Sequence, residues 1–263
     1  MVKSLDMYDL DSLCTSFPTL FTYTTHDMEN RLTQVTSNGV SILKNWYDGM
    51  GRRIAKQEIV GGVTNKYLYV YSGWTCLAVL NGTTGQMLEH YTRGAGIGGD
   101  IGSIVAATHY TGSFTNGTFY YHNNHRGDVT CVRSGTVTVA TYDYKAYGEL
   151  RSSSGTYTSR YRFSSKEYEQ TVGWLYYGYR FYRPETGTFL TQDPLKELAG
   201  INQFSYCSGD PINNVDPLGL DWFDNASNFA AGFGDTVSFG LTGMARRGMG
   251  YDFIVDRNAG SYT

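Results

Sequence analysis

Three aspartates that each precede a proline are the residues of this chain best placed to do chemistry. Asp193, Asp210 and Asp216 all fall within residues 162–220, a run rich in aromatic residues. Proline biases the residue before it toward an extended backbone, so we expect these carboxylates at rigid bends between short strands. Rigid carboxylates can hydrolyse a peptide bond when one takes a proton from water and another, protonated, donates to the amide.

The composition indicates which elements hold these carboxylates. The chain has 263 residues, including 23 Tyr, 13 Phe and 32 Gly, and 17% of it is charged. Aromatic and β-branched residues separated by glycine turns favour short antiparallel strands over helices. We therefore expect an all-β protein of one or two domains. A net charge of -3 gives no sign of a polyanion-binding surface, so we expect no nucleic-acid partner.

A repeat organises the first 150 residues. Its clearest copies are HDMENRL at 26–32 and YDGMGRR at 47–53, whose aspartates stand 21 positions apart. In such a unit an alternating strand supplies Tyr, the Asp makes a turn and an Arg-Leu or Arg-Ile pair begins the return strand. Single hairpins are marginally stable, and stacking them edge to edge buries their apolar faces in one sheet. Strands are predicted at 66–71, 119–121, 137–144 and 174–182.

Four further pieces of the chain form an ordered set. They read YGYRFYRP at 177–184, GTFLTQDP at 187–194, NQFSY at 202–206 and PINNVDPLGL at 211–220. Together they resemble the RHS-repeat-associated core, which ends the YD-repeat shell of bacterial Rhs polymorphic toxins and of the C components of insecticidal toxin complexes. The resemblance implies stacked antiparallel YD-repeat hairpins that form a spiralling curved sheet, here a partial shell.

The same resemblance implies a self-cleavage site. Members of that family cut their own chain after the leucine of the DPxGL ending, which here is the bond between Leu220 and Asp221. By the motif match, Asp193 takes the position of the general base and Arg180 stabilises negative charge through its planar guanidinium. Glu169 stands where the family commonly has an aspartate and is the expected second carboxyl group. Without the motif, an Arg-Asp pair between strands is more often a structural ion pair.

The expected organisation has four parts. Residues 1–20 match no repeat, 21–150 hold the YD repeats, 151–220 form the core, and 221–263 resemble the pre-toxin linker that begins the variable C-terminal region. In this last part we expect a short amphipathic helical tail, because four apolar residues recur at intervals of four. They are Phe229, Phe233, Val237 and Leu241.

Other patterns indicate no cofactor and no metal. GAGIGG at 94–99 contains a GxGxxG match, but the surrounding β-repeat pattern and the lack of a suitably spaced acid favour a glycine-rich loop. His122 and His125 lack partners at ligand spacing. The N-terminus has early acids and no apolar signal region, and no stretch is long and apolar enough for a membrane span. We expect synthesis in the cytoplasm without a signal peptide, and export by a dedicated secretion system.

The function that the resemblance implies is the shell of an Rhs-type toxin, which encapsulates and releases a C-terminal toxin by aspartyl self-cleavage. Its expected partners are its own C-terminal toxin segment, a secretion or delivery apparatus and an immunity protein. The alternative is a non-cleaving structural or cell-surface YD-repeat binding protein, in which the aspartates only shape turns. Release of residues 221–263 from a chain tagged at both ends distinguishes the two.

Overall fold

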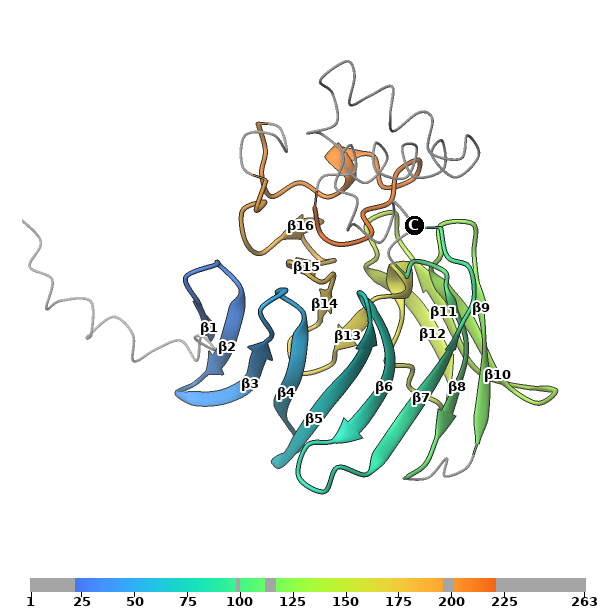
Figure 1. Ribbon diagram of the computed structural model, residues 1–263. Helices are drawn as coiled ribbons and strands as arrows, with labels where there is room; N and C mark the ends of the chain where they lie inside the picture. The colour runs from blue at the N-terminus through green and yellow to red at the C-terminus, as the bar shows by residue number, and fades with distance from the viewer. Residues whose placement is uncertain (1–21, 98–99, 112–116, 196–200, 221–263) are drawn as a thin grey trace, which may run out of the picture.

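A computed structural model describes residues 22–97, 100–111, 117–195 and 201–220. It contains a twelve-stranded antiparallel sheet whose strands follow chain order, and a four-stranded antiparallel sheet, so the expected all-β fold is confirmed. Figure 1 shows the large sheet curving around the small one. The expected helical tail lies outside the described residues. Within them, no helix is long and apolar enough to cross a membrane.

The strands of the large sheet are β1 (Thr22–His26), β2 (Leu32–Ser37), β3 (Val40–Tyr47), β4 (Arg53–Val60), β5 (Val63–Ser72), β6 (Thr75–Asn81), β7 (Met87–Arg93), β8 (Ile104–His109), β9 (Thr118–Asn123), β10 (Val129–Ser134), β11 (Val137–Tyr144) and β12 (Leu150–Gly155). The small sheet contains β13 (Glu167–Glu169), β14 (Trp174–Tyr176), β15 (Phe181–Arg183) and β16 (Thr188–Phe189). Two short 3₁₀ turns, η2 (Phe163–Ser165) and η4 (Cys207–Gly209), flank it in sequence. Three of the four predicted strands are confirmed as parts of β5, β9 and β11.

The predicted strand at 174–182 is wrong. The segment forms two strands, β14 and β15, with a tight turn between them. Gly178 in this turn has φ +107°, a conformation that only glycine adopts readily and that a strand does not contain. The aromatic residues on both sides of Gly178 continue the strand pattern, so the sequence pattern hides the turn. Only the glycine marks the position where the chain reverses direction.

The two clearest repeat copies form the same turn. Asp27 Oδ1 accepts the backbone N–H of Arg31 at 3.0 Å, and Asp48 Oδ1 accepts that of Arg52 at the same distance. In both turns the second carboxylate oxygen accepts the arginine Nε, at 2.7 and 2.8 Å. Aspartate is suited to this position because its short carboxylate can replace backbone acceptors in a turn. The repeated letters of the sequence therefore encode one repeated hydrogen-bond pattern.

The arginines of these turns connect successive repeats. Arg31 donates to the carbonyl of Asp48 at 3.3 Å, and its guanidinium lies 5.0 Å from the ring centroid of Tyr47. Arg52 lies 5.5 Å from the ring of Tyr71 in the same way. Cation–π contacts of this kind add up to about 1 kcal/mol each at exposed sites. Each turn thus supports the next, which explains how single hairpins build a continuous wall.

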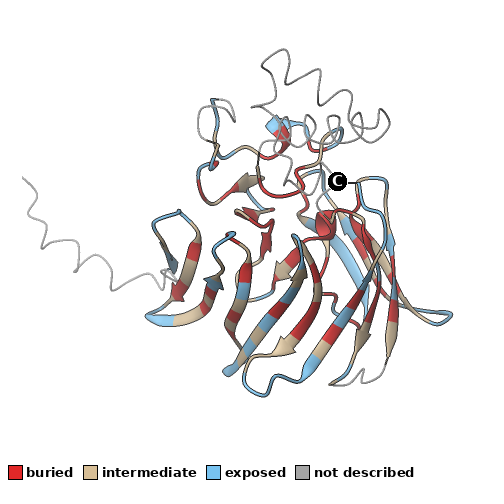
Figure 2. Ribbon diagram, in the orientation of Figure 1, coloured by how far each residue is buried: buried red, intermediate tan, exposed pale blue. Residues whose placement is uncertain are grey.

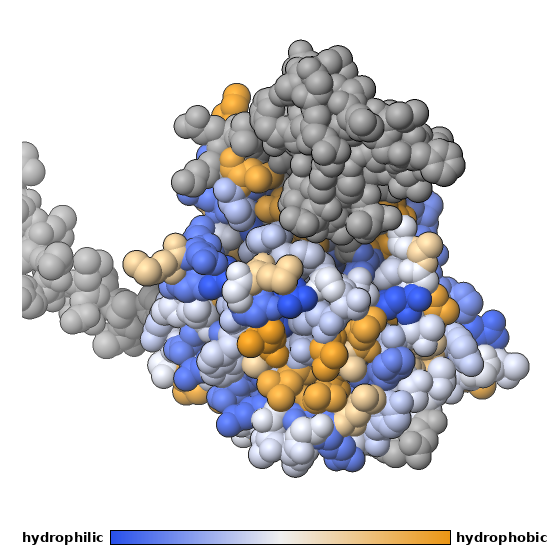
Figure 3. Space-filling model, in the orientation of Figure 1, coloured by the Kyte–Doolittle hydropathy of each residue, from blue (hydrophilic) through white to orange (hydrophobic). Residues whose placement is uncertain are grey.

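The core lies on the concave face of the large sheet, where Figure 2 shows buried positions alternating with exposed ones along the strands. On β5, Tyr69 is buried, whereas its neighbours Leu68 and Val70 are 39% and 42% exposed. This period of two follows from the pleat of a strand. Figure 3 shows apolar side chains also gathered on the outer face of the large sheet.

A separate aromatic core holds the small sheet. Its members come from β14, β15, β16, the two 3₁₀ turns and the residues directly after β14 and before η4, and several of them pack in edge-on and tilted pairs. A third apolar cluster joins β14 and β15 to β2 and β3 of the large sheet. The small sheet is therefore packed into the curve of the first repeats. The aromatic core comprises Phe163, Leu175, Tyr177, Tyr182, Phe189, Tyr206 and Cys207.

Candidate functional site

The turn between β14 and β15 positions the predicted arginine. Tyr177 N–H donates to the Arg180 carbonyl at 3.0 Å and closes the turn. A Cβ on Gly178 would lie 3.3 Å from the Leu218 carbonyl oxygen, so glycine permits a close approach between this turn and the end of the core. Arg180 is 2% exposed, and its guanidinium lies 3.7 Å from the ring centroid of Phe189.

Arg180 brings two aspartates together. Its Nη2 lies 2.5 Å from Asp193 Oδ2 and 3.7 Å from Asp216 Oδ2. Asp193 and Asp216 are 3% and 1% exposed. The structure therefore joins Arg180 and Asp193, as the sequence predicts, and adds Asp216 to them. In a buried site, the shared cation offsets the cost of placing two carboxyl groups side by side.

Backbone contacts fix Asp193 after β16. Its own N–H donates to the Gln203 carbonyl at 3.0 Å, and its Oδ1 accepts the Leu195 N–H at 2.8 Å. Arg180 Nη1 donates to the same Gln203 carbonyl at 2.9 Å. Because Oδ1 accepts a backbone N–H, Oδ2 faces the arginine. The carboxylate is thus held in one orientation, with both of its oxygens in defined contacts.

Asp216 holds the turn that ends at Leu220. Its Oδ1 accepts three successive backbone N–H groups, from Leu218 at 3.3 Å, Gly219 at 2.8 Å and Leu220 at 3.0 Å. The carbonyls are held from the other side, because Tyr179 N–H donates to Leu218 at 3.0 Å and Arg180 Nε donates to Gly219 at 2.5 Å. Both the N–H groups and the carbonyl groups of this turn are therefore hydrogen-bonded up to the predicted cleavage point. Asp221 lies outside the described residues.

The two aspartates differ in environment. Burial raises the pKa of Asp216 to about 7, against the opposing effects of Arg180 and of the backbone N–H groups. The carboxylate of Asp193 adds to this increase. Since Asp216 Oδ1 accepts the three backbone N–H groups, Oδ2 is the oxygen available to carry a proton when the group is neutral. A carboxyl group with a raised pKa beside one paired with arginine is the division of roles that acid–base hydrolysis needs.

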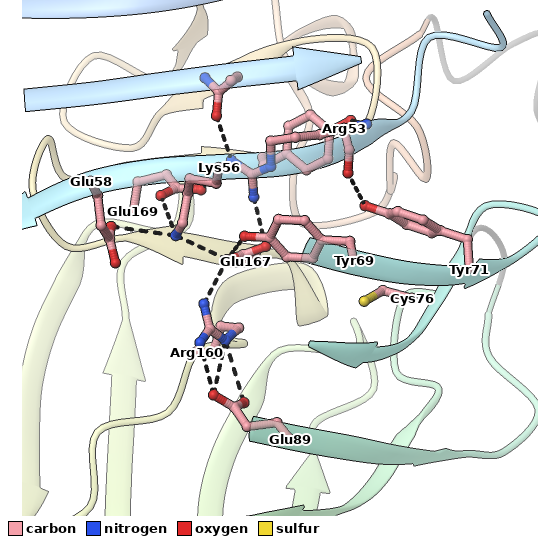
Figure 4. Close-up of polar contacts among 12 residues, drawn as sticks. Arg53, Lys56, Glu58, Tyr69, Tyr71, Cys76, Glu89, Arg160, Glu167 and Glu169 are labelled. Carbon is pink, nitrogen blue, oxygen red and sulfur yellow. Dashed lines mark hydrogen bonds and ion pairs between the residues drawn. The ribbon is translucent and has the colours of Figure 1, made fainter. Parts of the chain in front are cut away.

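Glu169, the predicted second carboxyl group, lies in a different cluster (Figure 4). It is 0% exposed, and its carboxylate contacts Arg53 Nη1 at 2.5 Å and Lys56 Nζ at 2.9 Å. Glu167 on the same face of β13 contacts Arg53 Nη2 at 2.6 Å and accepts the Tyr69 hydroxyl at 2.8 Å. These residues join β13 to β4 and β5 of the large sheet. The structure therefore does not bring Glu169 to Arg180 and Asp193.

The sequence contains a signal for Asp216 as a member of the site. Asp216 is the first residue of the segment DPLGL. An aspartate followed by proline and glycine is typical of a turn in which the aspartate side chain accepts backbone N–H groups from residues two to four positions later. The sequence predicts this carboxylate at a rigid bend, and the structure adds its place beside Arg180. Among the residues that the structure describes, no group of three or more His, Cys, Asp or Glu side chains could hold a metal ion.

Comparisons with known proteins agree with this architecture. No family model matches the chain. The tRNA3(Ser)-specific nuclease WapA of Bacillus spizizenii is 34% identical over 225 residues, which cover 80% of this chain and 9% of that protein. Toxin subunit YenC2 of Yersinia entomophaga is 34% identical over 94 residues, 33% of this chain and 10% of that protein.

A similar fold is present in the crystal structure of TcdB2-TccC3-Cdc42, with a TM-score of 0.61 and 22% identity. The match covers 77% of this chain and 10% of that one. The chain thus spans about a tenth of the length of each of these three proteins.

Proposed function

Because this chain is an RHS/YD-repeat protein, we propose that it forms part of a toxin shell and cuts its own backbone between Leu220 and Asp221. The observation that carries the proposal is the buried pair of Asp193 and Asp216, which share Arg180 at the turn that ends at Leu220. A structural ion pair needs only one of these aspartates. The second carboxyl group, whose pKa burial raises to about 7, gives the pair an acid as well as a base.

In the proposed reaction, Asp193 takes a proton from a water molecule, whose oxygen adds to the carbonyl carbon of Leu220. Arg180, which already donates to the adjacent Gly219 carbonyl, stabilises the negative charge that develops. Asp216 gives its proton to the amide nitrogen of Asp221 as the C–N bond breaks. The products are the carboxylate of Leu220 and a new amino terminus at Asp221.

The curvature of the large sheet supports the shell role. Among the strands that the structure describes, the outermost ones, β1 and β12, are almost entirely exposed and each pairs with a single neighbour. An open strand edge is a template for a further strand, so hairpins added at either edge would extend the same wall. Cleavage would separate the wall from a C-terminal toxin. The expected partners are that toxin, a delivery apparatus and an immunity protein.

The test is a chain tagged at both ends and measured by intact mass after purification. We expect two species, which end at Leu220 and begin at Asp221. A chain that remains whole on prolonged incubation at pH 6 to 7 would reject self-cleavage. It would favour the alternative, a structural or cell-surface YD-repeat binding protein, and leave the fold assignment unchanged.

The pKa of Asp216 predicts the pH dependence of this reaction. Because burial raises that pKa to about 7, the protonated acid is present below this pH and is lost as the pH rises through it. We expect the first-order cleavage rate to fall about fivefold between pH 7 and pH 8. The measurement follows a chain that is refolded from denaturant into buffers of different pH. A rate that rises over this interval would contradict the assignment of Asp216 as the acid.

A further inference from the structure

Lys166 approaches the candidate site from a side that the proposed chemistry does not use. It stands between η2 and β13, is 7% exposed, and its Nζ donates to the Pro217 carbonyl at 2.5 Å. Pro217 directly follows Asp216. The lysine therefore contacts the backbone between the candidate acid and the bond that is cut.

This contact completes a regular pattern. Three successive carbonyls, those of Pro217, Leu218 and Gly219, accept from Lys166 Nζ, Tyr179 N–H and Arg180 Nε. The N–H groups of the same turn all donate to Asp216. The next carbonyl along the chain belongs to Leu220 and is the one that the proposed reaction attacks. Its direction depends on how firmly the three preceding peptide units are held.

The backbone before Lys166 is strained and secured on several sides. Ser164 and Ser165 have φ values of 51° and 52°, in the left-handed region, which is strained for residues other than glycine. Ser164 N–H donates to Asp128 Oδ1 at 2.9 Å. Ser165 Oγ donates to the Gly127 carbonyl at 2.7 Å and accepts the Gly102 N–H at 3.0 Å. The repeat sheet thus maintains the conformation that directs Lys166 toward Pro217.

The surroundings of Lys166 distinguish it from a surface lysine. It borders a cavity of about 50 Å³, together with Leu218 and Tyr177. Burial lowers the pKa of Lys166 to about 8, while Asp100 and Asp216 favour its charged form and Arg93 opposes it. The amine remains a hydrogen-bond donor in either protonation state, since even neutral it carries two N–H groups.

We propose that Lys166 is a positioning residue for cleavage, which fixes the Pro217 carbonyl and thereby aligns the Leu220 carbonyl with Asp193 and Asp216. This inference rests on the proposed function. A misplacement of about 1 Å is enough to slow a positioned reaction by up to roughly 100-fold. Loss of the amine should therefore lower the rate while the fold persists.

The experiment compares four full-length chains tagged at both ends: the parent, Lys166→Met, Lys166→Arg and Lys145→Met. Lys145 is an exposed lysine whose side chain is 54% accessible, so its variant should cleave at the parent rate. Lys166→Met should cleave roughly 10- to 100-fold more slowly. Lys166→Arg should recover part of the rate, because it keeps a donor and the adjacent cavity accommodates the longer side chain.

A second measurement, amide hydrogen exchange, reports how firmly the 216–220 turn is held in chains that do not cleave. In chains that also carry Asp193→Asn, hydrogen exchange at the amides of Leu218, Gly219 and Leu220 should accelerate with Lys166→Met, while that of the large sheet stays unchanged. Equal cleavage rates for the parent and Lys166→Met would overturn this inference alone. An arginine variant as slow as the methionine variant, or unchanged exchange, would also overturn it. A parent chain that stays whole would reject the proposed function and this inference with it.

Discussion

Asp193→Asn is expected to leave the chain whole. Asparagine has nearly the same shape and can still accept the Leu195 N–H through its amide oxygen, a bond that measures 2.8 Å in the parent. It cannot take a proton from water, and it removes the negative partner 2.5 Å from Arg180 Nη2. Loss of a general base slows such reactions about 100- to 10,000-fold. Intact mass of a doubly tagged chain, sampled over days, measures the effect.

Asp210→Asn is the matched control, because Asp210 also precedes a proline in the same stretch of chain. Its carboxylate contacts Asn213 at the surface, with Nδ2 at 2.9 Å from Oδ2, and none of its hydrogen bonds reaches Arg180. This variant should be cleaved as fast as the parent. Cleavage of Asp193→Asn at the parent rate would remove Asp193 from the mechanism. Equal slowing of both variants would indicate a general effect on folding.

The repeats could be read from the sequence because their information is local. Asp27 and Asp48 each organise a turn with residues no more than four positions away, so similar letters produce similar geometry. The alternation of Tyr on β5 likewise follows from the pleat of one strand. The pairing of Arg180 with Asp193 was predictable only through the motif, because nothing in the spacing alone places those two side chains together.

The position of Glu169 could not be predicted because it depends on packing between distant segments. Glu167 and Glu169 alternate along β13 and so share a face, which is a visible pattern of two acids in one short strand. Their partners, Arg53 and Lys56, lie more than 100 residues earlier on β4. Only the packing of the small sheet into the curve of the repeats brings these charges together. The family position of Glu169 therefore predicts a residue of the cleavage site. In this structure Glu169 instead belongs to a buried ion cluster with Arg53, Lys56 and Glu167, which joins the two sheets and which we call the clamp.

This clamp connects the repeats to the proposed chemistry. Glu167 immediately follows Lys166, so the charges that hold β13 also hold the lysine that contacts Pro217. Tyr179, which precedes Arg180, packs against Trp74 of the large-sheet segment in a tilted ring pair with centroids 4.6 Å apart. Two residues that contact the 216–220 turn, Lys166 and Tyr179, are therefore both held in place by the large sheet. We therefore expect the geometry of the proposed cleavage site to form only after the repeats have folded around the core.

Arg53→Met should cause the largest loss of stability among single substitutions in this clamp. Arg53 is 0% exposed, contacts Glu169 and Glu167 at 2.5 and 2.6 Å, and its guanidinium lies 4.3 Å from the ring centroid of Tyr176. Methionine fills part of the volume but leaves two buried carboxylates with less positive charge. Removing one partner of a buried ion pair costs about 3–5 kcal/mol.

Urea unfolding of chains that carry Asp193→Asn, so that all remain whole, measures the effect on the free energy of unfolding. Arg151→Met is the control, because Arg151 pairs with Asp143 at 3.3 Å at the surface, where their side chains are 62% and 54% accessible. An exposed pair contributes about 0–1 kcal/mol, so this variant should unfold near the parent midpoint. Similar midpoints for Arg53→Met and Arg151→Met would show that the buried charges do not join the two sheets. A large difference between them would show that contact with the repeats stabilises the core, which is the arrangement on which the proposed cleavage would depend.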